Sequence, residues 1–160
     1  GVVPLSKIQK KMEGKTLLNL TDEFRIKADA LIQNALACKK SPETTLAWRS
    51  LQMAKSWLGK LKGELGSDTP YAVVSQVKDI PPTAEVYQGE LQVSSGGHLA
   101  DVNLMRQKIQ ELHDEISTNT NFNGRVTACI AFQHLAEARF WYGFELQNLR
   151  ENANKETANV

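Results

Sequence analysis

Residues 44–59 read TTLAWRSLQMAKSWLG, and residues 128–143 read ACIAFQHLAEARFWYG. When the two stretches are aligned at an offset of 84 positions, Trp57 matches Trp141 and Gly59 matches Gly143. A repeated segment decides whether one fold or two copies of a smaller unit must be explained. The repeat predicts a mainly α protein made of two antiparallel helical hairpins in tandem.

Apolar residues spaced three and four apart predict the two helices of the first hairpin, residues 21–66. Thr21 is expected to start its first helix, because a threonine hydroxyl can accept hydrogen bonds from the unpaired amides there. Ser41-Pro42-Glu43 predicts the start of the second helix, and Gly66 its end. The two apolar stripes are Phe24, Ala28, Leu31, Ala35, Cys38 and Ala47, Leu51, Ala54, Leu58, Leu61, Leu65.

The second hairpin, residues 98–152, follows the same pattern with a longer turn at residues 118–124. A hairpin alone buries too little apolar surface to offset the entropy of ordering its chain. We therefore expect the two hairpins to pack on each other and the protein to form a homo-oligomer. The stripes are Val102, Met105, Ile109, Leu112, Ile116 and Ala131, Leu135, Ala138, Tyr142, Leu146, Leu149.

Three segments lie outside the hairpins. Residues 1–20 are predicted to form a short basic helix that ends at Gly14, and residues 153–160 a disordered tail. Residues 67–97 are rich in proline, glycine and β-branched residues, which favours a partly extended connector with short β-strands.

The composition of the chain limits its class. Its 160 residues are 41% hydrophobic and 23% charged, as in soluble globular proteins. No stretch approaches the roughly 18 apolar residues of a membrane helix, and no leader sequence is recognisable, so we expect a cytoplasmic protein without a membrane partner. Cys38 and Cys129 have no further ligands at metal-binding spacing, and both are expected to be buried thiols. The sequence predicts no metal site, no cofactor and no catalytic motif.

The charge is unevenly distributed: residues 1–63 carry a net charge of +7 and residues 64–160 a net charge of −6. Such a division fits either an anion-binding face or head-to-tail association of subunits. The numbers of cations and anions in the whole chain are too even for an extended nucleic-acid partner.

The candidate ligand-binding residues are cations and aromatic rings. Lys55 and Arg139 occupy the same position of the repeat, two residues before the matched tryptophans. A cation beside an indole can pair with phosphate while the ring stacks on a base, although its aliphatic stem can also simply cover the tryptophan. The other candidates are Arg49, Arg125, Tyr71 and Tyr87.

Residues 44–59 and 128–141, together with Thr69-Pro70-Tyr71 and the KDIPPTAE segment at 78–85, carry a family resemblance. The chain resembles, over residues 21–88 and 98–150, the hairpin domain of bacteriophage anti-CBASS and anti-Thoeris sponge proteins. Proteins of that family sequester cyclic oligonucleotides or cyclic ADP-ribose isomers of bacterial immunity without cleaving them, and they assemble as oligomers with ligands held between protomers.

The resemblance implies a viral, non-enzymatic counter-defence protein that binds a cyclic nucleotide in the cytoplasm of an infected bacterial host. The chain departs from the family pattern in having two hairpins, and in having Pro42 where an arginine often opens the helix. Arg125 is therefore expected to serve only the second hairpin.

Two other functions fit the sequence. The hairpins could form an assembly module that binds another protein and no small ligand. The third candidate is a metal-dependent nucleotide pyrophosphatase that uses Glu111, Asp114 and Glu115.

Overall fold

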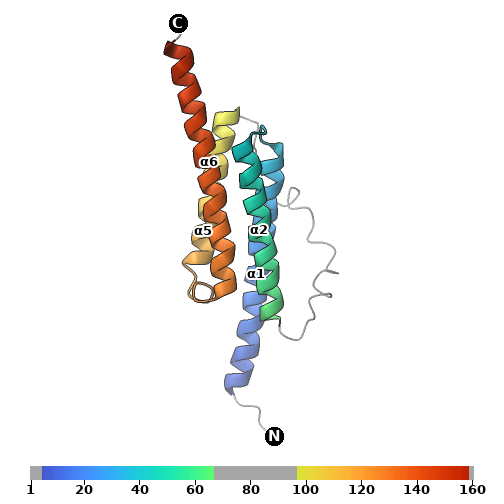
Figure 1. Ribbon diagram of the computed structural model, residues 1–160. Helices are drawn as coiled ribbons and strands as arrows, with labels where there is room; N and C mark the ends of the chain where they lie inside the picture. The colour runs from blue at the N-terminus through green and yellow to red at the C-terminus, as the bar shows by residue number, and fades with distance from the viewer. Residues whose placement is uncertain (1–4, 67–96, 159–160) are drawn as a thin grey trace.

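The computed structural model describes the backbone of residues 5–66 and 97–158, and the side chains of residues 17–66 and 97–156. This part of the chain is mainly helical and contains no strand, so the predicted α class is confirmed. The predicted β-strands, Tyr71 and Tyr87 lie outside the described residues. The four helices are α1 (Leu5–Ala37), α2 (Pro42–Leu65), α5 (His98–Ser117) and α6 (Val126–Ala158) (Figure 1).

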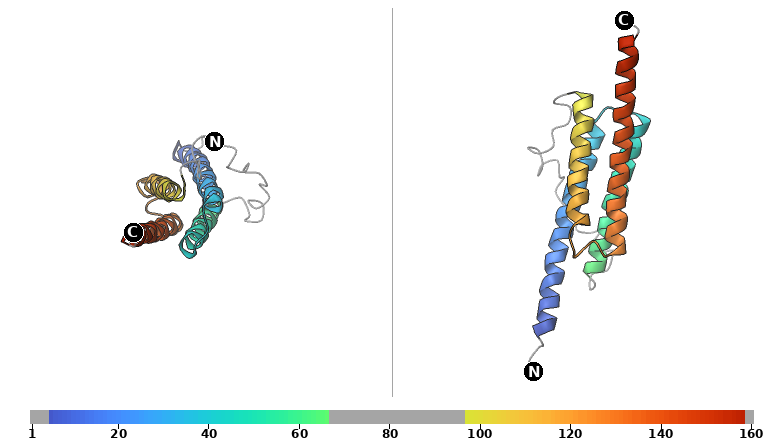
Figure 2. Two further views of the ribbon diagram at one scale, coloured as in Figure 1. Left: turned by 90° about the horizontal axis from the view of Figure 1, so that it is seen from above. Right: turned by 90° about the vertical axis from the view of Figure 1, so that its left-hand side faces the viewer.

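The helices form two antiparallel pairs that lie side by side (Figures 1 and 2). α1 packs on α2 and α5 on α6, while α2 and α6 make the most extensive contact between the pairs. α2 ends and α5 begins at opposite ends of the bundle (Figure 1). The 24 residues of α2 span about 36 Å, so a short turn could not join these two helices. The connection between the two pairs must therefore be long.

The predicted apolar stripes form the core. Every stripe residue is buried except Leu65 and Leu149, which are half-buried and pack against the others. Buried apolar residues from all four helices belong to one continuous cluster. The prediction that the two hairpins pack on each other is therefore confirmed. None of the described helices has a stretch long and apolar enough to span a membrane.

Polar contacts fix the position of α2 against α6. Near one end of α2, Asn148 Nδ2 donates to Glu43 Oε1 at 3.1 Å. Near the other end, Thr127 Oγ1 donates to Glu64 Oε1 at 2.7 Å. Because residue numbers rise along α2 as they fall along α6, both contacts belong to one antiparallel register.

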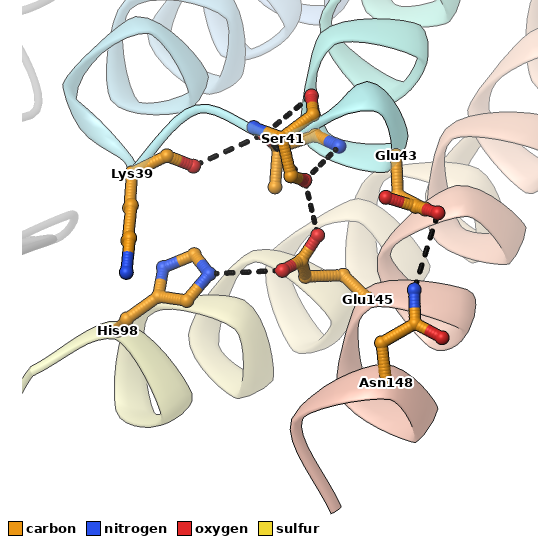
Figure 3. A network of polar contacts seen from close by, with 7 residues as sticks. Lys39, Ser41, Glu43, His98, Glu145 and Asn148 are labelled. Carbon is orange, nitrogen blue, oxygen red and sulfur yellow. Dashed lines mark hydrogen bonds and ion pairs between the residues drawn. The ribbon is translucent and has the colours of Figure 1, made fainter. Parts of the chain in front are cut away.

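A buried carboxylate, Glu145, joins three parts of the bundle (Figure 3). Ser41 caps α2 by accepting a hydrogen bond from the amide of Thr44 at 3.1 Å, and its hydroxyl donates to Glu145. His98 Nε2, at the start of α5, lies 3.3 Å from the other carboxylate oxygen. In a serine–histidine–acid triad the histidine lies between the other two groups, whereas here the carboxylate does. The network therefore holds helix ends together and does not pair a nucleophile with a base.

The predicted N-terminal boundary is wrong. α1 continues through Gly14 and Thr21, so residues 5–37 form one helix and no separate helix ends within residues 1–20. The hydroxyl of Thr21 donates to the Leu17 carbonyl at 2.7 Å, a bond formed inside a helix and not at its start. A glycine in a helix interior costs only about 1 kcal/mol. Packing of Leu17 and Leu20 against the core can offset that cost.

The predicted disordered tail is also wrong as far as Ala158, because α6 continues to that residue. The side chains of residues 151–156 are exposed. α1 and α6, each 33 residues long, extend beyond the bundle at opposite ends (Figures 1 and 2). These ends are helical without helical neighbours among the described residues.

The two cysteines differ in burial. Cys38 is 4% exposed, as expected, whereas Cys129 is half-buried and donates from Sγ to the Asn123 carbonyl at 3.2 Å. The prediction of a buried thiol is therefore right for Cys38 and wrong for Cys129. Burial, with a smaller effect from the nearby Asp101 carboxylate, raises the pKa of Cys38 to about 11.

We expect the two thiols to react at very different rates with a thiol-specific reagent at pH 8. The reactive species is the thiolate, and the raised pKa and burial of Cys38 keep both its thiolate fraction and its accessibility low. Absorbance of the released product should show one fast thiol and a second that reacts only as the protein unfolds. The fast phase should vanish in Cys129→Ser, and its persistence there would contradict the assignment.

Candidate anion-binding grooves

An open groove of about 530 Å³, here called groove 1, runs between α1 and α2. Its size suits a small organic ligand, for which protein sites commonly measure about 300–1,000 Å³. Its wall combines two cations with an indole ring. The lining residues are Arg25, Asp29, Ile32, Gln33, Leu36, Trp48, Gln52, Lys55, Ser56 and Gly59.

Arg25 lies over a glycine of the facing helix. A Cβ atom placed on Gly59 would lie 3.7 Å from Nε of Arg25 and 3.8 Å from its terminal guanidinium atoms. A longer side chain at residue 59 would thus occupy the space of the guanidinium. Nε of Arg25 is buried and makes no hydrogen bond to any described residue, and no ion pair neutralises this side chain in that part of the chain. Arg25 therefore retains its donors for an anion.

Lys55 and Trp48 line the same groove. Lys55 Nζ lies 2.6 Å from Asp29 Oδ1, so this predicted site residue is held in place and partly neutralised. The indole Nε1 of Trp48 is buried without a hydrogen-bond partner among the described residues. Lys55 was expected to pair with Trp57. The cation over the Trp57 ring is instead Lys60, whose Nζ lies 4.9 Å from the ring centre.

A second open groove, here called groove 2, measures about 350 Å³ and lies between α5 and α6. Arg106 lies over Gly143, where a Cβ atom would be 3.8 Å from Nε of the arginine. The same combination of arginine on one helix and glycine on the facing helix therefore occurs in both hairpins. The lining residues are Asn103, Arg106, Gln107, Gln110, Glu111, Asp114 and Arg139.

The two arginines of groove 2 form no ion pair within the described residues, although Arg139 attracts the Asp114 carboxylate. The Nε atoms of Arg106 and Arg139 are buried, and neither finds a partner in the described residues. Burial, followed by repulsion from Arg139 and Arg150, lowers the pKa of Arg106. Hydrogen bonds from His113 and Gln110 lower the pKa of Asp114, which stays ionised.

The structure does not bring the sequence-predicted cations together. Lys55 lies in groove 1 and Arg139 in groove 2. Arg49 is exposed on α2 beside a separate depression. Arg125 is exposed before the start of α6, where its Nε donates to the Asn121 carbonyl at 3.0 Å.

Sequence reasoning missed Arg25 and Arg106. The two are 81 residues apart, the offset that aligns the first helices of the hairpins, whereas Gly59 and Gly143 are 84 apart. A search for arginines matched at the shorter offset could have found them. They were missed because an arginine beside an apolar stripe looks like any solvated helix residue.

The carboxylates of the predicted pyrophosphatase site face in two directions. Glu115 pairs with Lys27 of α1 at 2.8 Å, whereas Glu111 and Asp114 line groove 2. Within residues 17–66 and 97–156, no group of three histidine, cysteine or acidic side chains is arranged to hold a metal ion.

The geometry of the two grooves carries the functional argument for this chain. Each groove places a guanidinium that forms no ion pair within the described residues beside a helix–helix crevice, which suits an anionic ligand. No protein-family model, curated protein or solved structure matches the chain.

Proposed function

We propose that the protein binds a cyclic nucleotide in groove 1 and sequesters it without turnover. The observation that carries this proposal is the guanidinium of Arg25, which has no ion-pair partner in the described part of the chain and lies over Gly59 in a groove of nucleotide size that Trp48 also lines. The sponge family that the sequence resembles has this activity. Action as a phage counter-defence protein in the bacterial cytoplasm is part of the same proposal and rests on the resemblance alone.

The chemistry of groove 1 suits the two parts of a nucleotide. The guanidinium of Arg25 can donate two parallel hydrogen bonds to a phosphate, and Lys55, partly neutralised by Asp29, lines the same groove. Trp48 offers an indole surface for a base, an interaction worth about 1–3 kcal/mol per base. Binding needs no group that performs chemistry on the ligand.

We further propose that the two hairpins are copies of one unit related by an approximate twofold axis. Glu43 and Thr127 are equivalent at the offset of 84, as are Glu64 and Asn148. A twofold rotation that superimposes one hairpin on the other therefore relates the contact between Thr127 and Glu64 to the contact between Asn148 and Glu43. The arginine and glycine pairs of the two grooves follow the same exchange.

Calorimetric titration against a panel of cyclic dinucleotides, cyclic trinucleotides and cyclic ADP-ribose isomers tests the proposed function. We expect at least one member to bind and to be recovered intact after heat release, because the proposal includes no cleavage. Chromatography of the released ligand separates a sponge from a hydrolase. No binding across the whole panel, or recovery of a cleaved product, would rule the proposal out.

A protein-binding module is the second candidate. Phe140 and Phe144 on α6 are 63% and 40% exposed, and their rings pack edge to face at 4.7 Å, with Trp141 next to them. Exposed aromatic clusters are typical of protein interfaces. An assembled protein that gains no thermal stability from any nucleotide would favour this function.

A further inference from the structure

We propose that groove 2 is a binding site for compact polyphosphate anions, in which Arg106 and Arg139 each hold one of two adjacent phosphate groups. This proposal is independent of cyclic nucleotide binding in groove 1. It rests on two guanidinium groups that reach one groove from facing helices and whose Nε atoms are buried without a hydrogen-bond partner among the described residues. Arg139 attracts the Asp114 carboxylate of the same groove, but neither arginine forms an ion pair within the described residues.

The two arginines are in an unfavourable state without an anion. Burial lowers the pKa of Arg106, and repulsion from Arg139 and then Arg150 lowers it further. Each Nε is also buried and has no hydrogen-bond partner in residues 17–66 and 97–156, so no contact there compensates for the loss of its hydration. An anion that accepts hydrogen bonds from both guanidinium groups would relieve the repulsion and pair both donors.

Groove 2 differs from groove 1 in having no ion pair between its two helices among the described residues. In groove 1 the Asp29 carboxylate pairs with Lys55 at 2.6 Å. In groove 2, Gln110 corresponds to Asp29 at the offset of 81, and Arg139 corresponds to Lys55 at the offset of 84. Gln110 is neutral and donates its amide to Asp114 at 2.6 Å, so it does not neutralise Arg139.

The acidic rim of groove 2 limits the size of the anion. Glu111 and Asp114 line the groove on α5, and Asp114 stays ionised because hydrogen bonds lower its pKa. An anion that reached these carboxylates would be repelled, so a compact anion held by Arg106 and Arg139 is favoured over a larger one. A diphosphate carries two charged groups on adjacent phosphorus atoms and suits two arginines better than a single phosphate does.

Calorimetric titration of the full chain with inorganic pyrophosphate, in buffer that contains a chelator, tests the proposal. We expect one molecule to bind per chain, with orthophosphate roughly 10-fold weaker or more. Arg106→Gln and Arg139→Gln should each raise the Kd roughly 10- to 100-fold, the range for loss of a charged hydrogen bond. Lys155→Gln removes the same charge from an exposed site on α6 and should change the Kd less than about twofold.

Thermal unfolding without ligand separates lost binding from lost folding. Because Arg139 forms no ion pair within the described residues, Arg139→Gln should unfold at nearly the same temperature as the unsubstituted protein, yet bind pyrophosphate more weakly. Titration with ADP shows whether the bound anion is free pyrophosphate or the diphosphate of a nucleotide. If ADP binds as tightly as pyrophosphate, the site accepts the diphosphate of a nucleotide. If ADP binds much more weakly, the ligand is the free inorganic anion. The proposal is overturned by no pyrophosphate binding at millimolar concentration, by binding that requires Mg²⁺, or by equal effects of Lys155→Gln and Arg139→Gln.

Discussion

Phe122→Ala is expected to lower the free energy of unfolding by about 3–5 kcal/mol, the range for removing a fully buried phenylalanine. Phe122 is 0% exposed, although it lies in the turn between α5 and α6. Its ring packs edge to face on Phe24 of α1, with the ring centres 5.2 Å apart. The substitution therefore removes a contact between the two hairpins as well as leaving a cavity in the core.

Urea unfolding followed by circular dichroism measures this effect. Val126→Ala is the matched control, because Val126 follows the same turn but is 75% exposed and should change stability by less than about 0.5 kcal/mol. A loss below about 1 kcal/mol in Phe122→Ala would show that the turn does not fill the core as described. An equal loss of stability in both variants would show that any substitution near this turn lowers the free energy of unfolding, and that the Phe122 ring has no special role.

The apolar periodicity predicted the helices and their buried faces well. Leu51 and Leu135, for example, lie on stripes with steps of three and four, and both are fully buried. The cap at Ser41 was also predictable, because its Ser-Pro-Glu sequence allows few other local structures. These signals are local, so they can be recognised without knowledge of how the helices pack.

Features that depend on packing could not be predicted in this way. Gly14 and Thr21 look like helix boundaries, yet α1 passes through both because its neighbouring leucines contact the core. Nothing local to residues 119–124 shows that Phe122 is buried, since its partner Phe24 lies on another hairpin. The relative directions of the two hairpins likewise follow from contacts between α2 and α6, distant in sequence.

The candidate site was only partly predictable for the same reason. The matched position of Lys55 and Arg139 identified one residue of each groove. Arg25 and Arg106 gain their meaning from the glycines on the facing helices, so they become recognisable only when both helices of a hairpin are considered together. Whether a cation is free or neutralised also depends on such neighbours, as Asp29 shows for Lys55.

Arg25→Glu is expected to raise the Kd of the cyclic nucleotide bound in groove 1 by roughly 100-fold or more. The substitution removes charge-assisted hydrogen bonds worth about 1.5–3 kcal/mol each and adds repulsion between the new carboxylate and the phosphate. Asp29 lines the same groove, so the variant would place a second carboxylate there. Calorimetric titration with the tightest ligand of the cyclic nucleotide panel measures the change.

Lys60→Glu provides the comparison for this charge reversal, because Lys60 is exposed on the same helix as Gly59 and does not line groove 1. Its effect on the Kd should stay below about threefold, since screening weakens interactions between distant exposed charges. Arg25→Gln is a control for misfolding of the charge-reversal variant. It should weaken binding roughly 10-fold or more and unfold at nearly the same temperature as the unsubstituted protein. If Lys60→Glu weakened binding as much as Arg25→Glu, the ligand would respond to overall charge, and groove 1 would not be its site.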